Sequence, residues 1–192
     1  MLISHHRDIR EEWPITVFDA YMWVRDYCKQ AAFVTKVDGD VWVHLGNLVH
    51  YLRSAPSHSL YGGKVSIVTL GKGIRYKGIK FVPDDCPPTR NVFVQGGGNV
   101  LSQDLIPYIN IGTEYLDYLP PGVEDNTISR ILQMVGVGAT NMQGYHGLLL
   151  YERLRGKIPG NAVFVHCRGF DVLKSVWEQQ SSIQVLPGGY TP

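Results

Sequence analysis

The C-terminal third of the chain constrains the fold most, because helix and strand signals alternate there without a break. Asp125-Asn126-Thr127 can cap a helix over residues 128–135, which Gly136-Val137-Gly138 then ends. The apolar run Ala162–His166 is typical of a strand buried on both faces, and residues 171–179 predict the next helix. This alternation predicts an α/β fold, with a partly parallel sheet and helices packed on it.

Two further elements extend the predicted alternation. Residues 144–155 carry apolar side chains on one side and predict a helix between the first helix and the buried strand. Residues 183–186 predict a final strand. We expect the sheet to be mixed and flanked by helices.

The first two thirds of the chain have shorter and less regular signals. Apolar residues at three- and four-residue spacing predict a helix over residues 9–34, and Asp38-Gly39-Asp40 is a turn signal. The other predicted elements are a strand at 41–44, a helix at 48–52, a hairpin over 64–82 turning at 71–73, and strands at 91–95 and 108–111. We therefore expect one α/β domain over residues 1–192, with a hairpin-rich middle section.

Composition excludes several classes of function. The chain has 192 residues, of which 44% are hydrophobic and 18% charged, and its formal net charge is +1. Low net charge with this hydrophobic fraction excludes intrinsic disorder. The strongest basic cluster, Arg153, Arg155 and Lys157, is typical of a solvated helix end. Phosphate binding by charge needs a broad basic surface, so we expect neither a nucleic-acid nor a membrane partner.

The cysteines and the N-terminus bear on compartment and cofactors. Cys28, Cys86 and Cys167 form no CxxC pair and no zinc-ligand spacing, which favours reduced thiols over disulfides. The first residues contain no apolar stretch of signal-peptide length, and no stretch approaches the roughly 20 residues of a membrane span. We expect a cytoplasmic protein without a metal or another cofactor.

The segment from His166 to Asp171 is the strongest candidate for chemistry. It follows a buried strand and precedes a helix, which is where ligands bind in open α/β sheets. His166 and Asp171 are the predicted catalytic residues, and Arg168 is a predicted substrate contact. A structural interpretation stays open, in which Cys167 is a small buried hydrophobe and Asp171 only caps the helix. The phosphatase pattern HCxxGxxR is absent.

Two glycine-containing segments are weaker candidates for substrate binding. Met142, Gln143 and His146 lie in a segment whose glycines allow a ligand, or a neighbouring helix, to approach the backbone closely. Gly97 lies in a glycine run after a predicted strand, where backbone N–H groups can bind an anion. That run lacks both the GxGxxG spacing and the lysine of a P-loop.

Residues 141–171 resemble the C-terminal part of purine nucleoside phosphorylases and nucleosidases. The similar residues are Met142-Gln143-Gly144, a following helix, Ile158-Pro159 and the run 162–171. The resemblance implies that Met142 and Gln143 contact a ribose and that Asp171 protonates a base, although the family has Glu where this chain has Gln143. The stretch is also similar to pyroglutamyl peptidases, in which a strand like 164–166 presents a catalytic histidine.

Two functional hypotheses remain open from the sequence. The first is a small-molecule hydrolase or glycosyl-transfer enzyme with its site at the carboxyl edge of the sheet and a proton-transferring Asp171 or His166. The second is a non-enzymatic assembly subunit of a virion or multiprotein complex, because low charge with many aromatic residues suits buried interfaces. The expected partners are accordingly a small-molecule ligand or protein subunits, and we expect a homo-oligomer.

Overall fold

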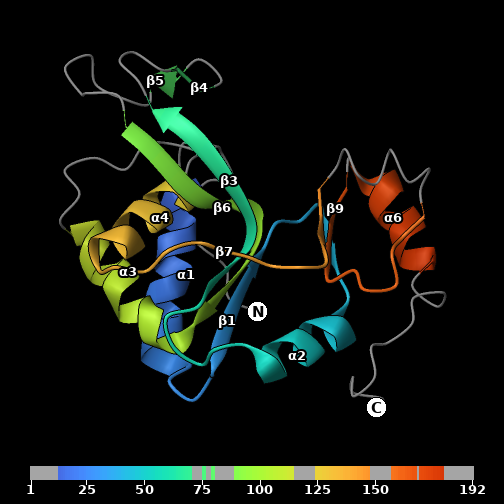
Figure 1. The fold of residues 1–192 in the computed structure, drawn as a ribbon, viewed down its shortest axis with the longest axis horizontal. Coiled ribbons are helices and arrows are strands. Elements are labelled where there is room, and N and C mark those ends of the chain that lie inside the picture. The colour runs from blue at the N-terminus through green and yellow to red at the C-terminus, as the bar shows by residue number, and fades with distance from the viewer. Residues whose placement is uncertain are drawn as a thin grey trace.

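The larger of two main sheets is built around one long central strand (Figure 1). The computed structural model describes residues 13–70, 75–76, 79–80, 89–114, 124–147, 157–167 and 169–179. β6 (Thr89–Ser102) pairs antiparallel with β1 (Phe33–Val37) on one side and with β3 (Tyr61–Leu70) on the other. β7 (Thr140–Asn141) joins the outer edge of β3 in parallel, which gives a mixed sheet of order β1-β6-β3-β7.

The smaller sheet follows directly from the larger one along the chain. β2 (Val41–Val43) is separated from β1 by three residues and pairs antiparallel with β9 (Phe164–His166). β8 (Tyr145–His146) lies on the other side of β9 and runs parallel to it. The turn between β1 and β2 therefore lies where the two sheets meet. A separate antiparallel pair consists of β4 (Arg75–Tyr76) and β5 (Ile79–Lys80).

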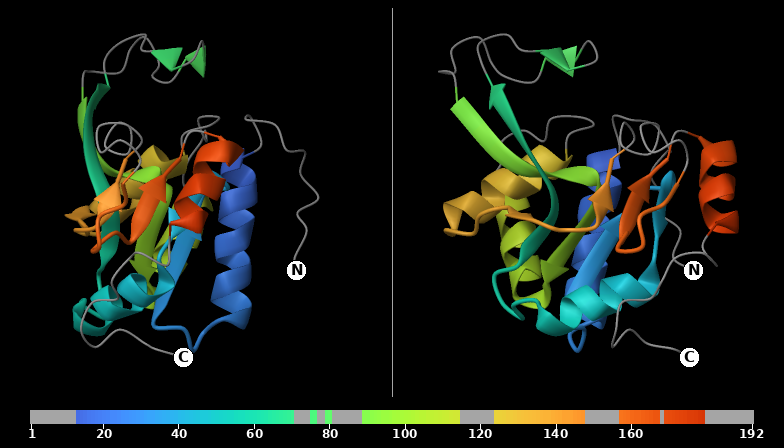
Figure 2. Two further views of the ribbon diagram at one scale, coloured as in Figure 1. Left: turned by 90° about the vertical axis from the view of Figure 1, so that its right-hand side faces the viewer. Right: turned by 45° about the vertical axis from the view of Figure 1, so that its right-hand side comes forward.

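Three helices cover one face of the larger sheet, as Figures 1 and 2 show. They are α1 (Trp13–Tyr27), α3 (Ile106–Glu114), which follows the 3₁₀ turn η1 (Gln103–Leu105), and α4 (Glu124–Met134). Their apolar faces form one buried cluster with β3 and β6: Phe18, Tyr21, Tyr61, Val94, Leu101, Leu105, Ile106, Ile109, Ile128 and Leu132. Among the described residues, no helix combines the length and the hydropathy needed to cross a bilayer.

The two remaining helices pack around the smaller sheet. α2 (Leu45–Ser54) begins at His44, whose Nδ1 accepts a hydrogen bond from Asn47 N–H at 3.0 Å. The buried Asn47 side chain donates to Ala162 O at 2.8 Å, which joins α2 to the segment that leads into β9. α6 (Phe170–Glu178) packs through Val176 near Trp42 of β2, and Figure 2 shows it outside the smaller sheet.

The α/β class, with a mixed sheet flanked by helices, is confirmed. The buried strand in 162–166 is β9, and the helices predicted at 48–52, 128–135 and 171–179 correspond to α2, α4 and α6. The long antiparallel pairing of β3 with β6 accounts for the hairpin-rich middle section. The predicted turn at 71–73 and strand at 183–186 lie outside the described residues.

Four local predictions are wrong, and each error has a physical reason. The helix expected over 9–34 ends at Tyr27, and its last two residues open strand β1, whose β-branched and aromatic side chains favour strand. Residues 108–111 are helical in α3 because that helix buries Ile109 against the α1 and α4 cluster. Residues 145–146 are a strand, since Gly144 turns the chain before them with φ +85°. Residues 65–70 pair with 89–94, so the described partner of this strand lies further along the chain than the predicted hairpin placed it.

Candidate active site

The turn Asp38-Gly39-Asp40 presents two carboxylates at the junction of the two sheets. Asp38 N–H donates to Gly97 O at 3.0 Å, and Cys167 N–H donates to Asp40 O at 2.8 Å. The turn is thus fixed to β6 on one side and to the end of β9 on the other. Its carboxylates are 42% and 48% exposed, so both can meet a ligand from solvent.

His166 faces the second of these carboxylates. Val41 pairs with His166 across β2 and β9, so Asp40, one residue before Val41, lies beside the imidazole. His166 Nε2 is 3.2 Å from Asp40 Oδ2, and the side chain is one-third exposed. A carboxylate and an imidazole at this distance can share a proton or bind one cation together.

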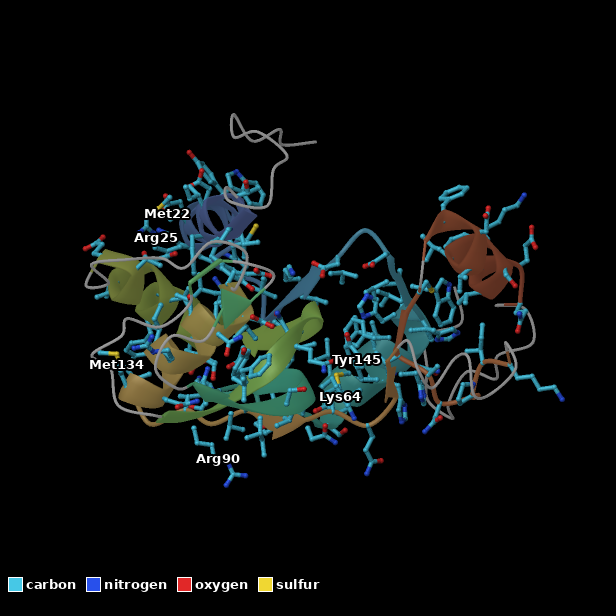
Figure 3. The ribbon with its side chains drawn as sticks, turned by 90° about the horizontal axis from the view of Figure 1, so that it is seen from above. Met22, Arg25, Lys64, Arg90, Met134 and Tyr145 are labelled. Carbon is cyan, nitrogen blue, oxygen red and sulfur yellow. The ribbon has the colours of Figure 1, made fainter. Side chains whose placement is uncertain are left out.

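The other ring nitrogen of His166 and the hydroxyl of Tyr145 both lie near Gly97. A Cβ atom on Gly97 would lie 2.7 Å from Tyr145 Oη and 3.5 Å from His166 Nδ1. A larger residue at position 97 would therefore crowd both side chains. Figure 3 shows Tyr145 between the larger sheet and the smaller one. The glycine leaves room between two polar groups from different strands.

Lys36 ties the turn to the rest of the site through all three protons of its ammonium. Nζ donates to Asp38 Oδ1 at 2.5 Å, to Gly96 O at 2.6 Å and to Glu124 Oε1 at 3.1 Å. Burial alone would lower the pKa of Lys36, but the charges and hydrogen bonds of Glu124 and Asp38 raise it overall. A permanently charged ammonium thus joins β1, β6 and the start of α4.

Asp125 lies beside Lys36's network at the N-terminus of α4. Gly96 N–H donates to its Oδ2 at 3.2 Å, and Asn126 N–H donates to its Oδ1 at 2.7 Å. Burial, and secondly the neighbouring Glu124 carboxylate, raise the pKa of Asp125 to about 6. Asp125 is therefore ionised at neutral pH and accepts a proton more readily than an ordinary aspartate does.

Lys36 connects these groups, and the adjacent residues Gly96 and Gly97 of β6 border them. Gly96 contacts Glu124 and Asp125 on one side, while Gly97 faces Tyr145 and His166. The site therefore combines a proton acceptor of raised pKa with a carboxylate–imidazole pair. Such a set can activate a hydroxyl group and bind an anionic ligand through a cation.

A metal ion would have two protein ligands here. Within the described part of the chain, no three His, Cys, Asp or Glu side chains group closely enough to hold a metal ion by themselves. Asp40 Oδ2 and His166 Nε2 form a pair of suitable donor types. Mg²⁺ is commonly bound by one or two carboxylates together with phosphate oxygens and water, so the pair fits a cation that arrives with a phosphorylated substrate.

The structure brings together two of the residues that the sequence singled out. His166 and Gly97 lie in the site. Met142 is buried in the apolar cluster with Val100 and Phe164, and Gln143 is exposed. The others are placed as follows: His146 is partly buried in β8, Asp171 is exposed in the first turn of α6, and Arg168 lies outside the described residues. The catalytic role of Asp171 and the substrate contacts of Arg168, Met142, Gln143 and His146 stay predictions.

Sequence reasoning missed most of the charged residues of the site. It treated Asp38-Gly39-Asp40 as a turn and Asp125 as a helix cap, and it did not consider Lys36 or Glu124. One signal was present: the two aspartates interrupt an apolar run over residues 33–43, although a turn needs only one polar residue. The partnership of Lys36 with Glu124 joins residues 88 positions apart and leaves no local trace.

Cys167 takes the structural role that the sequence left open for it. It is 1% exposed, and its Sγ donates to Val165 O at 3.4 Å. Burial raises the pKa of the thiol, which keeps it protonated and unreactive.

Comparison with known proteins identifies relatives of this chain. Residues 2–143, about three quarters of the chain, match the family model described as Galactosyltransferase. A mouse beta-1,3-galactosyltransferase 1 is 25% identical over 166 residues, which are 83% of this chain and 49% of that protein. A bovine UDP-GlcNAc:betaGal beta-1,3-N-acetylglucosaminyltransferase 9 is 37% identical over 84 residues, 42% of this chain and 20% of that protein.

A third relative is also a glycosyltransferase. A mouse acetylgalactosaminyl-O-glycosyl-glycoprotein beta-1,3-N-acetylglucosaminyltransferase is 26% identical over 126 residues, 64% of this chain and 31% of that protein. The chain thus spans half or less of the length of these relatives. The matched range 2–143 includes Asp38, Asp40 and Asp125, whereas Tyr145 and His166 follow it.

These findings correct two predictions made from the sequence. The resemblance to nucleoside phosphorylases and pyroglutamyl peptidases is wrong, because the matched family and relatives are glycosyltransferases. The terms hydrolase and structural subunit are wrong for the same reason, whereas the glycosyl-transfer part of the enzyme hypothesis is supported. The chain belongs to the galactosyltransferase family of glycosyl-transfer enzymes.

Proposed function

We propose that this chain transfers a hexosyl group from a uridine diphosphate sugar to a hydroxyl group of a β-galactoside. The observation that carries the proposal is the Lys36 network, which joins the start of α4, where Asp125 lies, to the turn that carries Asp40. Family membership supplies the reaction class. The printed name of the bovine relative, with UDP-GlcNAc as donor and betaGal as acceptor, suggests the two substrates.

At the donor end, the Asp40–His166 pair is positioned to bind the diphosphate through a divalent cation. Bound there, the cation would neutralise negative charge on the departing diphosphate. Asp40 supplies an oxygen donor from the turn before β2, and His166 supplies a nitrogen donor from the end of β9. The turn that carries Asp40 is fixed by backbone hydrogen bonds to Gly97 and Cys167, so the pair is preorganised.

At the acceptor end, Asp125 serves as the general base. The acceptor hydroxyl oxygen forms a bond to C1 of the sugar as the bond from C1 to the diphosphate oxygen breaks. The diphosphate leaves with the electron pair, and an Asp125 carboxylate oxygen takes the hydroxyl proton. A pKa of about 6 suits this role near neutral pH, because the group is both ionised and appreciably basic.

Lys36 positions the base and does not exchange a proton in this step. Its bonds to Gly96 and Glu124 fix the start of α4 against β6, which sets the place of Asp125. Its bond to Asp38 fixes the turn that carries Asp40. The Lys36 ammonium thereby fixes the donor end and the acceptor end of the site relative to each other.

A transfer assay tests the proposal. The full chain is incubated with Mg²⁺ or Mn²⁺, with UDP-GlcNAc or UDP-galactose, and with a β-galactoside, and released UDP is measured. We expect acceptor-dependent release with at least one donor, and a loss of about 10²-fold or more in Asp125→Asn. Asp171→Asn is the matched control, since the exposed Asp171 has no part in the proposed step. Equal rates in wild type and Asp125→Asn would exclude Asp125 as the base.

A further inference from the structure

The Tyr145 hydroxyl is a buried polar group that takes no part in the proposed reaction. Tyr145 is 7% exposed, and its Oη is shielded from solvent without a hydrogen-bond partner in the described part of the chain. Buried hydroxyl groups in proteins almost always have a partner, because burial removes their hydrogen bonds to water and an unmade bond costs free energy. An unpaired hydroxyl beside a candidate active site therefore points to a ligand.

The local structure aims this hydroxyl at the site and fixes it there. Gly144 turns the chain with φ +85°, and its carbonyl accepts hydrogen bonds from Val163 N–H at 2.8 Å and Phe164 N–H at 3.2 Å. The Tyr145 ring then packs on the Phe164 ring, with centroids 5.7 Å apart. These contacts hold the ring between the two sheets, so the hydroxyl is placed before any ligand arrives.

The absence of a side chain on Gly97 leaves room for the Tyr145 hydroxyl beside the candidate site. Tyr145 Oη and His166 Nδ1 lie 2.7 Å and 3.5 Å from the point where a Cβ of residue 97 would be, so an alanine there would displace the hydroxyl. The hydroxyl therefore lies next to β6 on the same side as the imidazole of the Asp40–His166 pair, where a ligand oxygen bound to that pair would be its nearest new partner.

The electrostatic surroundings make Tyr145 a hydrogen-bond donor. Burial, and then the carboxylates of Asp38 and Asp40, raise the pKa of the phenol. The hydroxyl thus keeps its proton at any pH at which the protein functions. Its natural partner is an acceptor oxygen, either of a phosphate or of a sugar hydroxyl group.

We propose that the Tyr145 hydroxyl donates a hydrogen bond to an oxygen of the nucleotide sugar, in a subsite above Gly97 that also borders His166. This inference rests on the proposed function, because it assumes a nucleotide-sugar donor. It adds a donor-binding residue from β8, outside the segment that matches the family model.

The test compares Tyr145→Phe with Tyr51→Phe. Tyr51 packs against the same apolar cluster but lies on α2, away from the site, so its substitution is a matched control. Isothermal titration measures the binding of UDP-GlcNAc, UDP-galactose and UDP alone in the presence of Mg²⁺. We expect Tyr145→Phe to bind the preferred UDP-sugar about tenfold more weakly, and Tyr51→Phe to bind it as wild type does.

Thermal unfolding separates a binding role from a structural one. Since the Tyr145 hydroxyl has no partner in the free protein, its removal should leave the Tm of Tyr145→Phe equal to or above that of wild type. A fall in Tm together with unchanged affinity would assign the hydroxyl a structural role and overturn the proposal. Unchanged affinity by itself also overturns it.

The ligands distinguish the source of the oxygen. Weaker binding of both UDP and the UDP-sugar assigns the contact to the diphosphate, and weaker binding of the sugar alone assigns it to a sugar hydroxyl group. Gly97→Ala is a second variant, which adds a methyl group 2.7 Å from Tyr145 Oη. It should weaken the binding of the same ligand. If wild type binds none of the three ligands, the proposed function fails together with this inference. If wild type binds a ligand and the variants bind it with the same affinity, this inference alone fails.

Discussion

The carboxyl group of Asp125 shows how one residue can lower stability and support chemistry. Its environment raises the pKa to about 6 from an ordinary value of 3.8. The folded protein therefore binds this proton more tightly than the unfolded chain does. Hydrogen bonds from Gly96 and Asn126 offset part of the destabilisation but leave the pKa raised.

This difference predicts a pH-dependent stability. As pH rises through the range from about 4 to about 6, the folded state must ionise Asp125 against its environment, so wild type loses stability. A shift of about two pKa units corresponds to about 3 kcal/mol. We expect the free energy of unfolding of Asp125→Asn, relative to wild type, to rise by up to that amount across this range in urea titrations. A constant difference at all pH values would show that the pKa of Asp125 is ordinary.

The same group predicts the pH dependence of turnover. The general base must be ionised, so kcat/KM should rise with pH through about 6 and then level off. The rising limb is measured with saturating acceptor and limiting donor. A profile that is already flat below pH 5 would contradict the assignment of Asp125.

Lys36 offers a residue-scale test of the polar network. Lys36→Met removes the cation between Asp38 and Glu124, which leaves two partly buried carboxylates without it. We expect a loss of about 3 kcal/mol in the free energy of unfolding, measured by urea denaturation. Lys174→Met is the control, because Lys174 pairs with Glu178 at 3.9 Å on an exposed face of α6, and it should change stability by about 0.5 kcal/mol or less. Equal effects of the two variants would show that the Lys36 network is as weak as a surface pair.

Single residues also mark the limit of what the sequence predicts about the site. His166 and Gly97 were found because each lies at the end of, or directly after, a recognisable apolar strand. Asp38, Asp40 and Asp125, which the proposal places in the site, also satisfy turn and capping preferences, so their local sequence gives no reason to prefer function. Their significance comes from tertiary contacts.

At the scale of elements, tertiary packing determines whether a segment is helix or strand where its local preference is ambiguous. The predicted elements that proved correct include β9, which lies in a continuous apolar run, and the helices α2, α4 and α6. Residues 108–111 contain two isoleucines and a tyrosine, which suit a short strand by propensity. They are helical because α3 fits between α1 and α4, a fit that no short window of sequence contains.

The contact between α3 and α4 gives an element-scale prediction. A methyl group on Gly112 of α3 would lie 2.4 Å from Ile131 Cγ2 of α4, so the helices would have to separate. We expect Gly112→Ala to destabilise the fold by about 1–2 kcal/mol, because overpacking outweighs the better helix propensity of alanine. Gly138→Ala, whose added methyl group would meet nothing within 4 Å, should leave the Tm unchanged. Stabilisation by Gly112→Ala would show that α3 and α4 can shift apart freely.

At the scale of the whole molecule, the candidate site lies where two mixed sheets meet. The turn at residues 38–40 leads from the larger sheet into the smaller one, and Gly96-Gly97 of the central strand β6 lies against both. Figure 1 shows β6 on one side of this junction and β9 on the other. Joining the sheets places the turn with Asp40 against the end of β9, and Lys36 connects this turn to the start of α4, which carries the proposed base.

The most direct test of the proposed transfer, with Asp125 as the base, is to identify the product that contains the sugar. NMR spectroscopy of a reaction that contains the full chain, UDP-sugar and a β-galactoside distinguishes a new glycosidic linkage from free sugar. We expect a new glycosidic linkage that forms with wild type, is lost with Asp125→Asn and persists with Asp171→Asn. Release of free sugar without any new linkage, or a linkage that forms equally in Asp125→Asn, would contradict it.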